Sequence, residues 1–216
     1  MLLEFCQHDF TLNEHENKET ILEAIKYKPN YISVFSYYAK SVCQITDIPV
    51  VCPIDFPVGL SDSKTRLQMG AFAIKNGARA LDITYPAQLI VNRKYDKFRE
   101  DIKNFNNLSI EHNVVIRYVL EYRKYSYELL YKLSQILLDF GVGTALLSTG
   151  YFLDDINDNI IAASMITKKN PNINIILTAN IWTKEHIDNT IKSGLSGFRA
   201  NNLNSLKLFS QNISSI

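Results

Sequence analysis

The stretch RALDITYPAQLIVNRKYDKFREDIKNFNNLSIEHNVVIRYVLE (residues 79–121) decides the fold. Its two ends, RALDI (79–83) and NVVIRYVLE (113–121), are short runs rich in β-branched and apolar residues, which is typical of buried strands. Between them, KFREDIKNFNNLSIEH (97–112) has the spacing of an amphipathic helix. Because two strands joined by a helical crossover run parallel, this stretch predicts one unit of a parallel sheet.

The same alternation of strand and helix fills the rest of the chain. The other strand-like runs are LLEFC (2–6), YISVF (31–35), VVCPI (50–54), GTALLS (143–148), NINIILT (172–178) and LSGFRA (195–200). Helical patterns separate them, such as SYELLYKLSQILLDFG (126–141), which ends at a glycine, and TKEHIDNTIKSG (183–194), where Thr183 is placed to cap the helix. Eight such units predict an α/β fold, a (β/α)8 TIM barrel, with a doubly wound open sheet as the alternative.

Length and composition favour one globular unit. A chain of 216 residues with no linker and no low-complexity tract suits a single TIM-barrel domain over residues 1–216. The hydrophobic fraction of 46% supplies ample core material. The net charge of +1, with no dense basic block, gives no support to a nucleic-acid partner.

The cysteines and the N-terminal segment predict a cytoplasmic protein. Three cysteines are an odd number without paired spacing, which argues against a disulfide framework and for a reducing compartment. MLLEFCQHDF (1–10) has no basic start and is interrupted by polar residues, so neither a signal peptide nor a membrane partner is expected. No His, Cys and carboxylate combination has metal-site spacing, so no metal and no cofactor are expected.

Polar side chains gather where the predicted strands end. In such barrels function lies at the C-terminal ends of the strands, and alternate residues of a strand face the same side. The inward polar set is Asp82, Arg117, Glu121, Ser148, Thr178, Arg199 and Asn201, with His8, Asp9 and Asp55 at strand ends. Ionised groups in apolar strands are costly unless they are paired or hydrogen-bonded, so this ring predicts a site.

Each of these residues also has a structural interpretation. Asp82 and Arg117 lie on neighbouring strands, so they form either a buried ion pair or part of a ligand site, and both roles can hold together. Asp9 and Asp55 are either functional carboxylates or loop caps. His8 beside Asp9 is either half of an acid–base pair or a satisfied structural histidine. In FSYYAK (35–40) the tyrosines pack or form pocket walls.

At these residues the chain resembles the deoxyribose-phosphate aldolase family, nearly from end to end. The matching segments, in the family's order and spacing, are HDFTLN (8–13), PIDFPVGLSDSKTRLQMGAFAIKNGARALDITYP (53–86), VIRYVLEY (115–122), LLSTGYF (146–152) and TANIWT (178–183). The resemblance implies a TIM barrel and a small-molecule ligand, with an anionic compound as one option. It also implies a homodimer as one assembly, although the sequence leaves the oligomeric state open.

The chain departs from the family where the chemistry takes place. These aldolases act through a lysine Schiff base, and the resemblance places Leu146 at that lysine and Ile176 at the second active-site lysine. GTALLSTG (143–150) contains no lysine. The resemblance places Arg117 at a family lysine, Glu121 at a family glutamate, and substrate or anion binding at Ser148, Thr149, Gly150, Thr178, Asn180, Arg199 and Asn201.

Two hypotheses from different classes follow. One is a diverged lyase or isomerase on a small carbonyl or phosphorylated sugar, with Asp82, Asp9 or Asp55 as acid or base and Arg117 and Arg199 orienting the substrate. A variant of it moves the imine to Lys124 on the rim of the barrel. The other is a catalytically inactive barrel that serves as a small-ligand-binding or regulatory protein.

Overall fold

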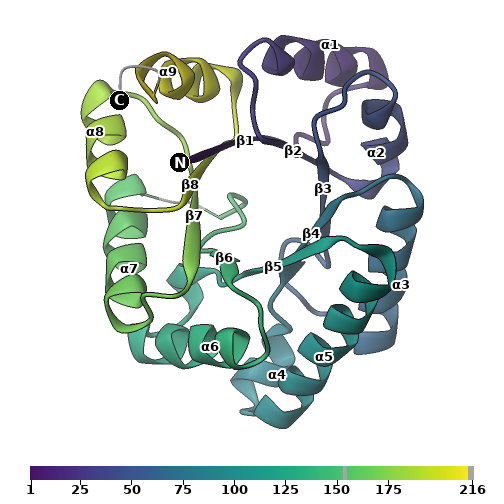
Figure 1. Cartoon of the computed structure of the whole chain (residues 1–216), viewed down its shortest axis with the longest axis vertical. Helices are drawn as coiled ribbons and strands as arrows, with labels where there is room; N and C mark the ends of the chain where they lie inside the picture. The colour runs from purple at the N-terminus through teal and green to yellow at the C-terminus, as the bar shows by residue number, and fades with distance from the viewer. Residues whose placement is uncertain (153–154, 214–216) are drawn as a thin grey trace.

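The computed structural model describes residues 1–152 and 155–213. Figure 1 looks into a ring of strands with helices around it. The strands are β1 (Leu2–Gln7), β2 (Tyr31–Val34), β3 (Val50–Ile54), β4 (Ala80–Thr84), β5 (Val115–Val119), β6 (Thr144–Leu146), β7 (Asn174–Ala179) and β8 (Gly197–Ala200). The helices are α1 (Glu14–Ile25), α2 (Ser36–Cys43), α3 (Ser63–Lys75), α4 (Ala87–Val91), α5 (Tyr95–His112), α6 (Tyr127–Asp139), α7 (Ile156–Lys169), α8 (Lys184–Lys192) and α9 (Leu203–Ile213), with a 3-10 turn η1 (Tyr122–Lys124).

The strands form a closed parallel barrel in sequence order, which confirms the predicted (β/α)8 fold and excludes the open sheet. Closure comes from the pairing of β1 with β8, in which Glu4 lies opposite Arg199. On the other side of the ring, Asp82 of β4 lies opposite Arg117 of β5. Strand pairing therefore places two pairs of opposite charge side by side, Glu4 with Arg199 and Asp82 with Arg117.

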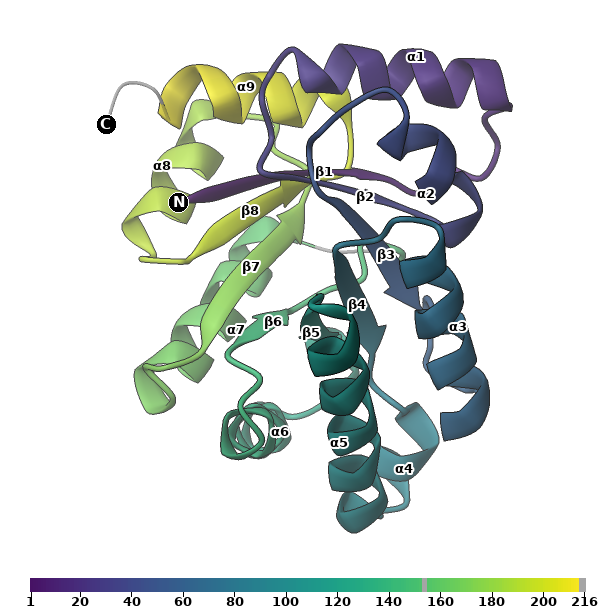
Figure 2. The ribbon, with the colours of Figure 1, turned by 45° about the vertical axis from the view of Figure 1, so that its right-hand side comes forward.

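Most of the apolar core lies between the barrel and its helices. Figure 2 shows α3 and α5 running along the outside of β3, β4 and β5. The contact includes Phe98 and Phe105 of α5, both fully buried. Inside the barrel a smaller apolar cluster consists of Val119, Leu146 and Ile176. The interior is thus apolar around β5, β6 and β7.

Local sequence signals explain where the helices begin. Asn13 accepts from the amides of α1 and completes a capping box with Glu16, and Asp62 caps α3. The Thr183 hydroxyl accepts from the His186 amide, which confirms the predicted cap of α8. Helix α4 was not predicted, because five residues are too few for a helical period. Among the described helices, none is long and apolar enough to cross a lipid bilayer.

Candidate functional site

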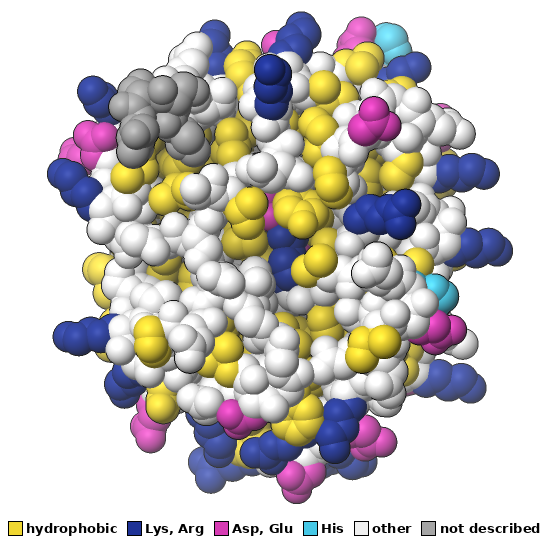
Figure 3. Space-filling view, viewed as in Figure 1, with side chains coloured by type: hydrophobic (Ala, Val, Ile, Leu, Met, Phe, Trp, Pro, Cys, Tyr) yellow, Lys and Arg dark blue, Asp and Glu magenta, His cyan; other side chains and the backbone are white. Residues whose placement is uncertain are grey.

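Four charged side chains meet inside the barrel and form what we call the charge cluster: Glu4 of β1, Asp82 of β4, Arg117 of β5 and Arg199 of β8. Their side chains are only 0–4% exposed. Figure 3 shows basic and acidic atoms at the bottom of a central hollow framed by apolar side chains. An ionised group in such a place needs partners, because burial of an unpaired charge is very costly.

Within the charge cluster each carboxylate contacts both guanidinium groups. Arg117 Nε donates to Asp82 Oδ1 at 2.7 Å, and its Nη1 donates to Glu4 Oε1 at 2.5 Å. Arg199 Nη2 lies 2.7 Å from Glu4 Oε2 and 2.5 Å from Asp82 Oδ2. The predicted Asp82–Arg117 ion pair is therefore present, but as half of a closed four-residue ring.

Neighbouring charges shift the pKa values of three members of the charge cluster. Burial is the largest influence on Asp82 and works against its charged form, but Arg117 and Arg199 outweigh it and hold the pKa of Asp82 below its usual value. Burial also opposes the charge of both guanidinium groups, yet Asp82 and Glu4 raise their pKa values. Asp82 thus has no proton to donate, and both of its oxygens contact arginine.

Glu4 is the member of the charge cluster that the sequence analysis missed. It is fully buried and contacts Arg117 and Arg199. The signal was available, because Glu4 interrupts the apolar run LLEFC and has the same strand parity as His8. The rule of alternation that selected Asp82 would have selected Glu4 as well.

Small polar side chains line the barrel beyond the charge cluster, toward the C-terminal ends of the strands. They are Cys6, Ser33, Thr84, Ser148 and Thr178, all buried. Thr84 follows Asp82 by two residues and Thr178 follows Ile176 by two, so both face inward. Their hydroxyls have no hydrogen-bond partner among the described residues. Buried polar atoms are nearly always satisfied in native proteins, so these two require an explanation.

A row of aromatic rings crosses the mouth of the barrel above these side chains. The members of this aromatic row are His8, Phe35, Phe56, Tyr151 and Phe152. His8 stacks on Phe35 with 4.7 Å between centroids, and Phe56 contacts Tyr151 edge to face at 5.9 Å. His8 Nε2 lies 3.0 Å from Ser33 Oγ, whereas its Nδ1 is buried without a partner in the described part of the chain.

Glu121 holds the loop between β6 and α7. It has a left-handed backbone, with φ of 46°, and its Oε2 accepts from the amide and the hydroxyl of Thr149. In the same loop the Gly150 amide donates to Ser148 Oγ, and the Tyr151 amide donates to Thr149 Oγ1. Three consecutive backbone amides of the loop are thus bonded within the protein.

The loops after β7 and β8 are tied to each other. Asn202 Nδ2 donates to Asn180 Oδ1, and Asn202 Oδ1 accepts from the Ser205 amide in the first turn of α9. The Ile181 amide donates to Ser205 Oγ at 2.8 Å. Asn201 contributes its Oδ1 as an acceptor at 3.4 Å from Asn202 Nδ2. In this way a side chain occupies the Ser205 amide in the first turn of α9, which would otherwise be available to an anion.

The two remaining predicted carboxylates lie apart from the charge cluster. Asp55, at φ of 57°, accepts from the amide and hydroxyl of Ser61 and pairs with Arg66 at 3.3 Å. Asp9 is exposed and accepts from the amide and hydroxyl of Thr11 at 2.9 and 2.5 Å, which lowers the pKa of Asp9. Both carboxylates stabilise loops in the structure.

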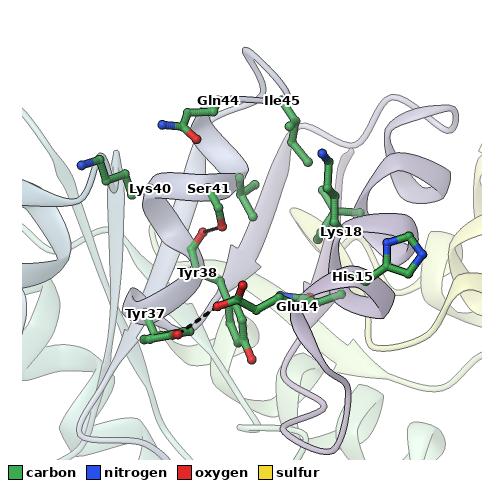
Figure 4. A pocket seen from close by; sticks show the side chains of 12 residues that line it. Glu14, His15, Lys18, Tyr37, Tyr38, Lys40, Ser41, Gln44 and Ile45 are labelled. Carbon is green, nitrogen blue, oxygen red and sulfur yellow. Dashed lines mark hydrogen bonds between the residues drawn. The ribbon is translucent and has the colours of Figure 1, made fainter.

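A cavity of about 660 Å³ lies outside the barrel, between α1 and α2. Figure 4 shows Tyr37 and Tyr38 in its wall and the hydrogen bond from the Tyr37 hydroxyl to Glu14. The two tyrosines line this outer cavity, and the predicted site residues do not. Its lining comes mainly from exposed side chains such as Lys18 and Lys40.

Every lysine of the chain lies within the described residues and is exposed. Leu146 and Ile176, at the two family lysine positions, are fully buried and contact each other and Val119. Lys124, the rim lysine, has its Nζ 4.3 Å from the centroid of the Phe152 ring. The described lysines therefore place no amine inside the barrel.

Comparison with known proteins identifies relatives of this chain. No protein-family model matches the chain. A deoxyribose-phosphate aldolase from Mycoplasmopsis pulmonis is 25% identical over 203 residues, which is 90% of each chain. Another from Aquifex aeolicus is 27% identical over 145 residues, 65% of this chain and 64% of the relative, just under two thirds of its length. This chain is a relative of the deoxyribose-phosphate aldolases.

Solved structures agree with this relation at the level of the fold. The aldolase QR15 matches with a TM-score of 0.86 and 20% identity over 99% of this chain and 96% of its own. A deoxyribose phosphate aldolase from Aeropyrum pernix, described as a tetramer, matches with a TM-score of 0.84 and 13% identity over 99% and 89%. In this deoxyribose-phosphate aldolase relative, then, the shared barrel encloses the charge cluster.

Proposed function

We propose that this chain is a deoxyribose-phosphate aldolase relative that has lost Schiff-base chemistry and acts as a small-ligand-binding or regulatory barrel. The charge cluster carries the proposal, because its four side chains are buried and paired with one another. A catalytic acid needs a proton to give, and a catalytic base needs a free lone pair within reach of the substrate. Asp82 is ionised, so it has no proton to give, and each of its carboxylate oxygens contacts a guanidinium group.

The positions of the lysines support the same proposal. An imine-forming lysine is activated by burial or by nearby positive charge, and it must reach the substrate carbonyl. Here the residues that resemble the two family lysines are the buried, apolar Leu146 and Ile176. The proposal includes a single domain over residues 1–216. It also includes a cytoplasmic location, because all three cysteines are free thiols.

Reductive trapping tests the loss of imine chemistry. The full chain is incubated with acetaldehyde or 2-deoxyribose 5-phosphate, reduced with borohydride and examined by intact-mass and peptide mass spectrometry. We expect no substrate-dependent adduct and no release of acetaldehyde from 2-deoxyribose 5-phosphate. Lys124→Arg serves as the matched variant, since it removes the rim amine and keeps the charge.

The proposal fails if a single lysine is modified in a substrate-dependent way and its substitution abolishes the adduct. Turnover of sugar phosphates or aldehydes above the rate of an Asp82→Ala variant would instead support a lysine-independent lyase or isomerase, the other hypothesis from the sequence. Equal background rates in both proteins agree with a barrel without catalysis.

A further inference from the structure

The cavity outside the barrel lies between two helices that pack mainly on other elements. Helix α1 lies against β1 and α9, whereas α2 lies against β3 and α3. The Tyr37 hydroxyl donates to Glu14 Oε1 at 2.9 Å and bridges the two helices at one end of the cavity, as Figure 4 shows. The volume of about 660 Å³ is in the range of small-molecule sites in proteins.

The deepest part of the cavity lining is apolar. Ile21 of α1 and Val42 of α2 line the cavity and are only 0% and 3% exposed. Tyr38 and Ile45 also line it and are half-buried. The Tyr38 ring contacts the Tyr37 ring edge to face, with 4.9 Å between centroids. Together these side chains offer a surface for the apolar body of a ligand.

One polar side chain belongs to the buried part of the lining. Asn17 lies on the same face of α1 as Ile21 and Ala24, and all three residues are buried. The inward face of a surface helix normally carries apolar residues, so an asparagine at this position is unusual. Because Asn17 also lines the cavity, its side-chain amide adds a hydrogen-bonding group to the apolar surface.

Lys18 has no ion-pair partner among the described residues, although Glu14 precedes it by one helical turn. Glutamate four residues before lysine on a helix is a favourable pair. Here Glu14 accepts from the Tyr37 hydroxyl instead, and the ion pairs of α1 involve other residues. In Figure 4 Lys18 extends away from Glu14, toward the end of the cavity where Gln44 and Ile45 lie. The Lys18 ammonium group is therefore available to an anion.

The charges of the described lining residues match one negative charge on a ligand. Lys18 and Lys40 are cations and Glu14 is an anion, which leaves a formal charge of +1 with histidine counted as neutral. A carboxylate carries one negative charge, whereas a phosphate monoester carries about −1.5 to −2 at neutral pH. Both lysines are exposed, so their attraction for the carboxylate is screened by water and is modest.

We propose that the cavity between α1 and α2 binds a small monocarboxylate with an apolar body. The carboxylate lies near Lys18, the body packs on Tyr38, Val42 and Ile45, and Asn17 supplies a hydrogen bond. This inference goes beyond the proposed function, because the cavity lies outside the barrel and takes no part in imine chemistry.

A matched pair of ligands tests the class of compound. Binding of 3-phenylpropionate and of 3-phenylpropanamide, which differ in the charge of the head group, is measured on the full chain by ligand-observed NMR and thermal shift, with octanoate and acetate beside them. We expect a Kd about fivefold lower for 3-phenylpropionate than for its amide, and no measurable binding of acetate, which has no apolar body. Equal affinity for the amide, or no binding of 3-phenylpropionate and octanoate, overturns the proposal.

Two variants locate the ligand. Lys18→Met removes the cation and keeps a long side chain, so the Kd of 3-phenylpropionate should rise about fivefold while that of the amide stays the same. Lys168→Met, at an exposed position near the end of α7, is the matched control and should change neither value. Ser41→Trp places a large ring in the cavity from an exposed position of α2 and should abolish binding of both compounds.

The outcomes of these experiments are separable. Circular dichroism and the Tm without ligand report whether Ser41→Trp folds, and Lys18→Met, on the exposed side of α1, decides the question if it does not. Unchanged affinity for 3-phenylpropionate in Lys18→Met, or in a folded Ser41→Trp, refutes the site. A lysine adduct in the trapping experiment refutes the proposed function alone.

Discussion

At the scale of single residues, the charge cluster is a set of side chains that depend on one another. A buried ion pair contributes little net stability, because desolvation of the two charges offsets their attraction. Removal of one partner is different, since it leaves the other charge buried and alone. The four members should therefore be strongly coupled in their effect on the free energy of unfolding.

We predict that Arg199→Met and Glu4→Leu each lower the free energy of unfolding by about 3–5 kcal/mol. The double variant leaves the neutral Asp82–Arg117 pair, which lies 2.7 Å apart, and should lose much less than the sum of the two single losses. Urea denaturation of the three variants measures this coupling. Lys26→Met, which removes an exposed pair with Glu23, should leave the urea midpoint nearly unchanged. Additive losses in the double variant would contradict the closed ring.

The sequence predicted part of this cluster. Strand parity and neighbouring strands were sufficient to place Asp82 beside Arg117. The contact of Arg199 with Asp82 needs the closure of the barrel, because β8 and β4 lie on opposite sides of the strand order. No local pattern states how far two long side chains reach across a barrel, so the four-way contact required the structure.

At the scale of elements, the loop between β6 and α7 is fixed from both sides. Glu121 holds the amide and hydroxyl of Thr149, and Gly150 lies against the inward face of β7. A Cβ on Gly150 would be 3.1 Å from Thr178 Cγ2 and 3.8 Å from Asn201 Nδ2. The loop therefore covers one of the unpartnered hydroxyls.

We predict that Gly150→Ala destabilises the protein more than Gly141→Ala does. Both glycines have left-handed backbones, with φ of 75° and 79°, so alanine costs about 1–2 kcal/mol at either position. Only Gly150 has atoms within 4 Å of the added Cβ, so its variant should lose about 1–3 kcal/mol more through overpacking. Chemical denaturation of both variants gives the difference. Equal losses of unfolding free energy in the two variants would show that the loop shifts to accommodate the added Cβ.

The sequence predicted the positions of strands and helices better than it predicted the contacts between loops. Eight strand-like runs and the Thr183 cap were correct because periodicity and capping are local. The bond between Asn180 and Asn202 joins two loops that are consecutive only in the folded barrel. Such contacts depend on tertiary geometry, so the match of TANIWT (178–183) to the family gave no information on what these asparagines contact.

At the scale of the whole molecule, a neutral histidine at the barrel mouth should affect acid stability. The pKa of His8 is lowered from 6.5 to about 3 by burial and by Arg199, with Asp82 acting in the opposite direction. A depressed folded-state pKa means that the unfolded chain takes up the proton first as the pH falls. The stability is therefore complete above about pH 6.5 and is lost progressively between pH 6.5 and 3.

We predict that the free energy of unfolding decreases as the pH is lowered through this window. The contribution of His8 to this decrease is at most about 1.4 kcal/mol per pH unit. The ring is half-buried, so the measured slope should be below that limit. In His8→Asn, which cannot take up the proton, the slope should flatten between pH 6.5 and 4, where Asp82 is still ionised. His15→Asn on the exposed start of α1 is the control and should keep the slope of the unmodified protein. Urea titrations at half-unit pH steps measure the free energy of unfolding of each protein. An unchanged slope in His8→Asn would mean that the histidine is protonated inside the folded barrel.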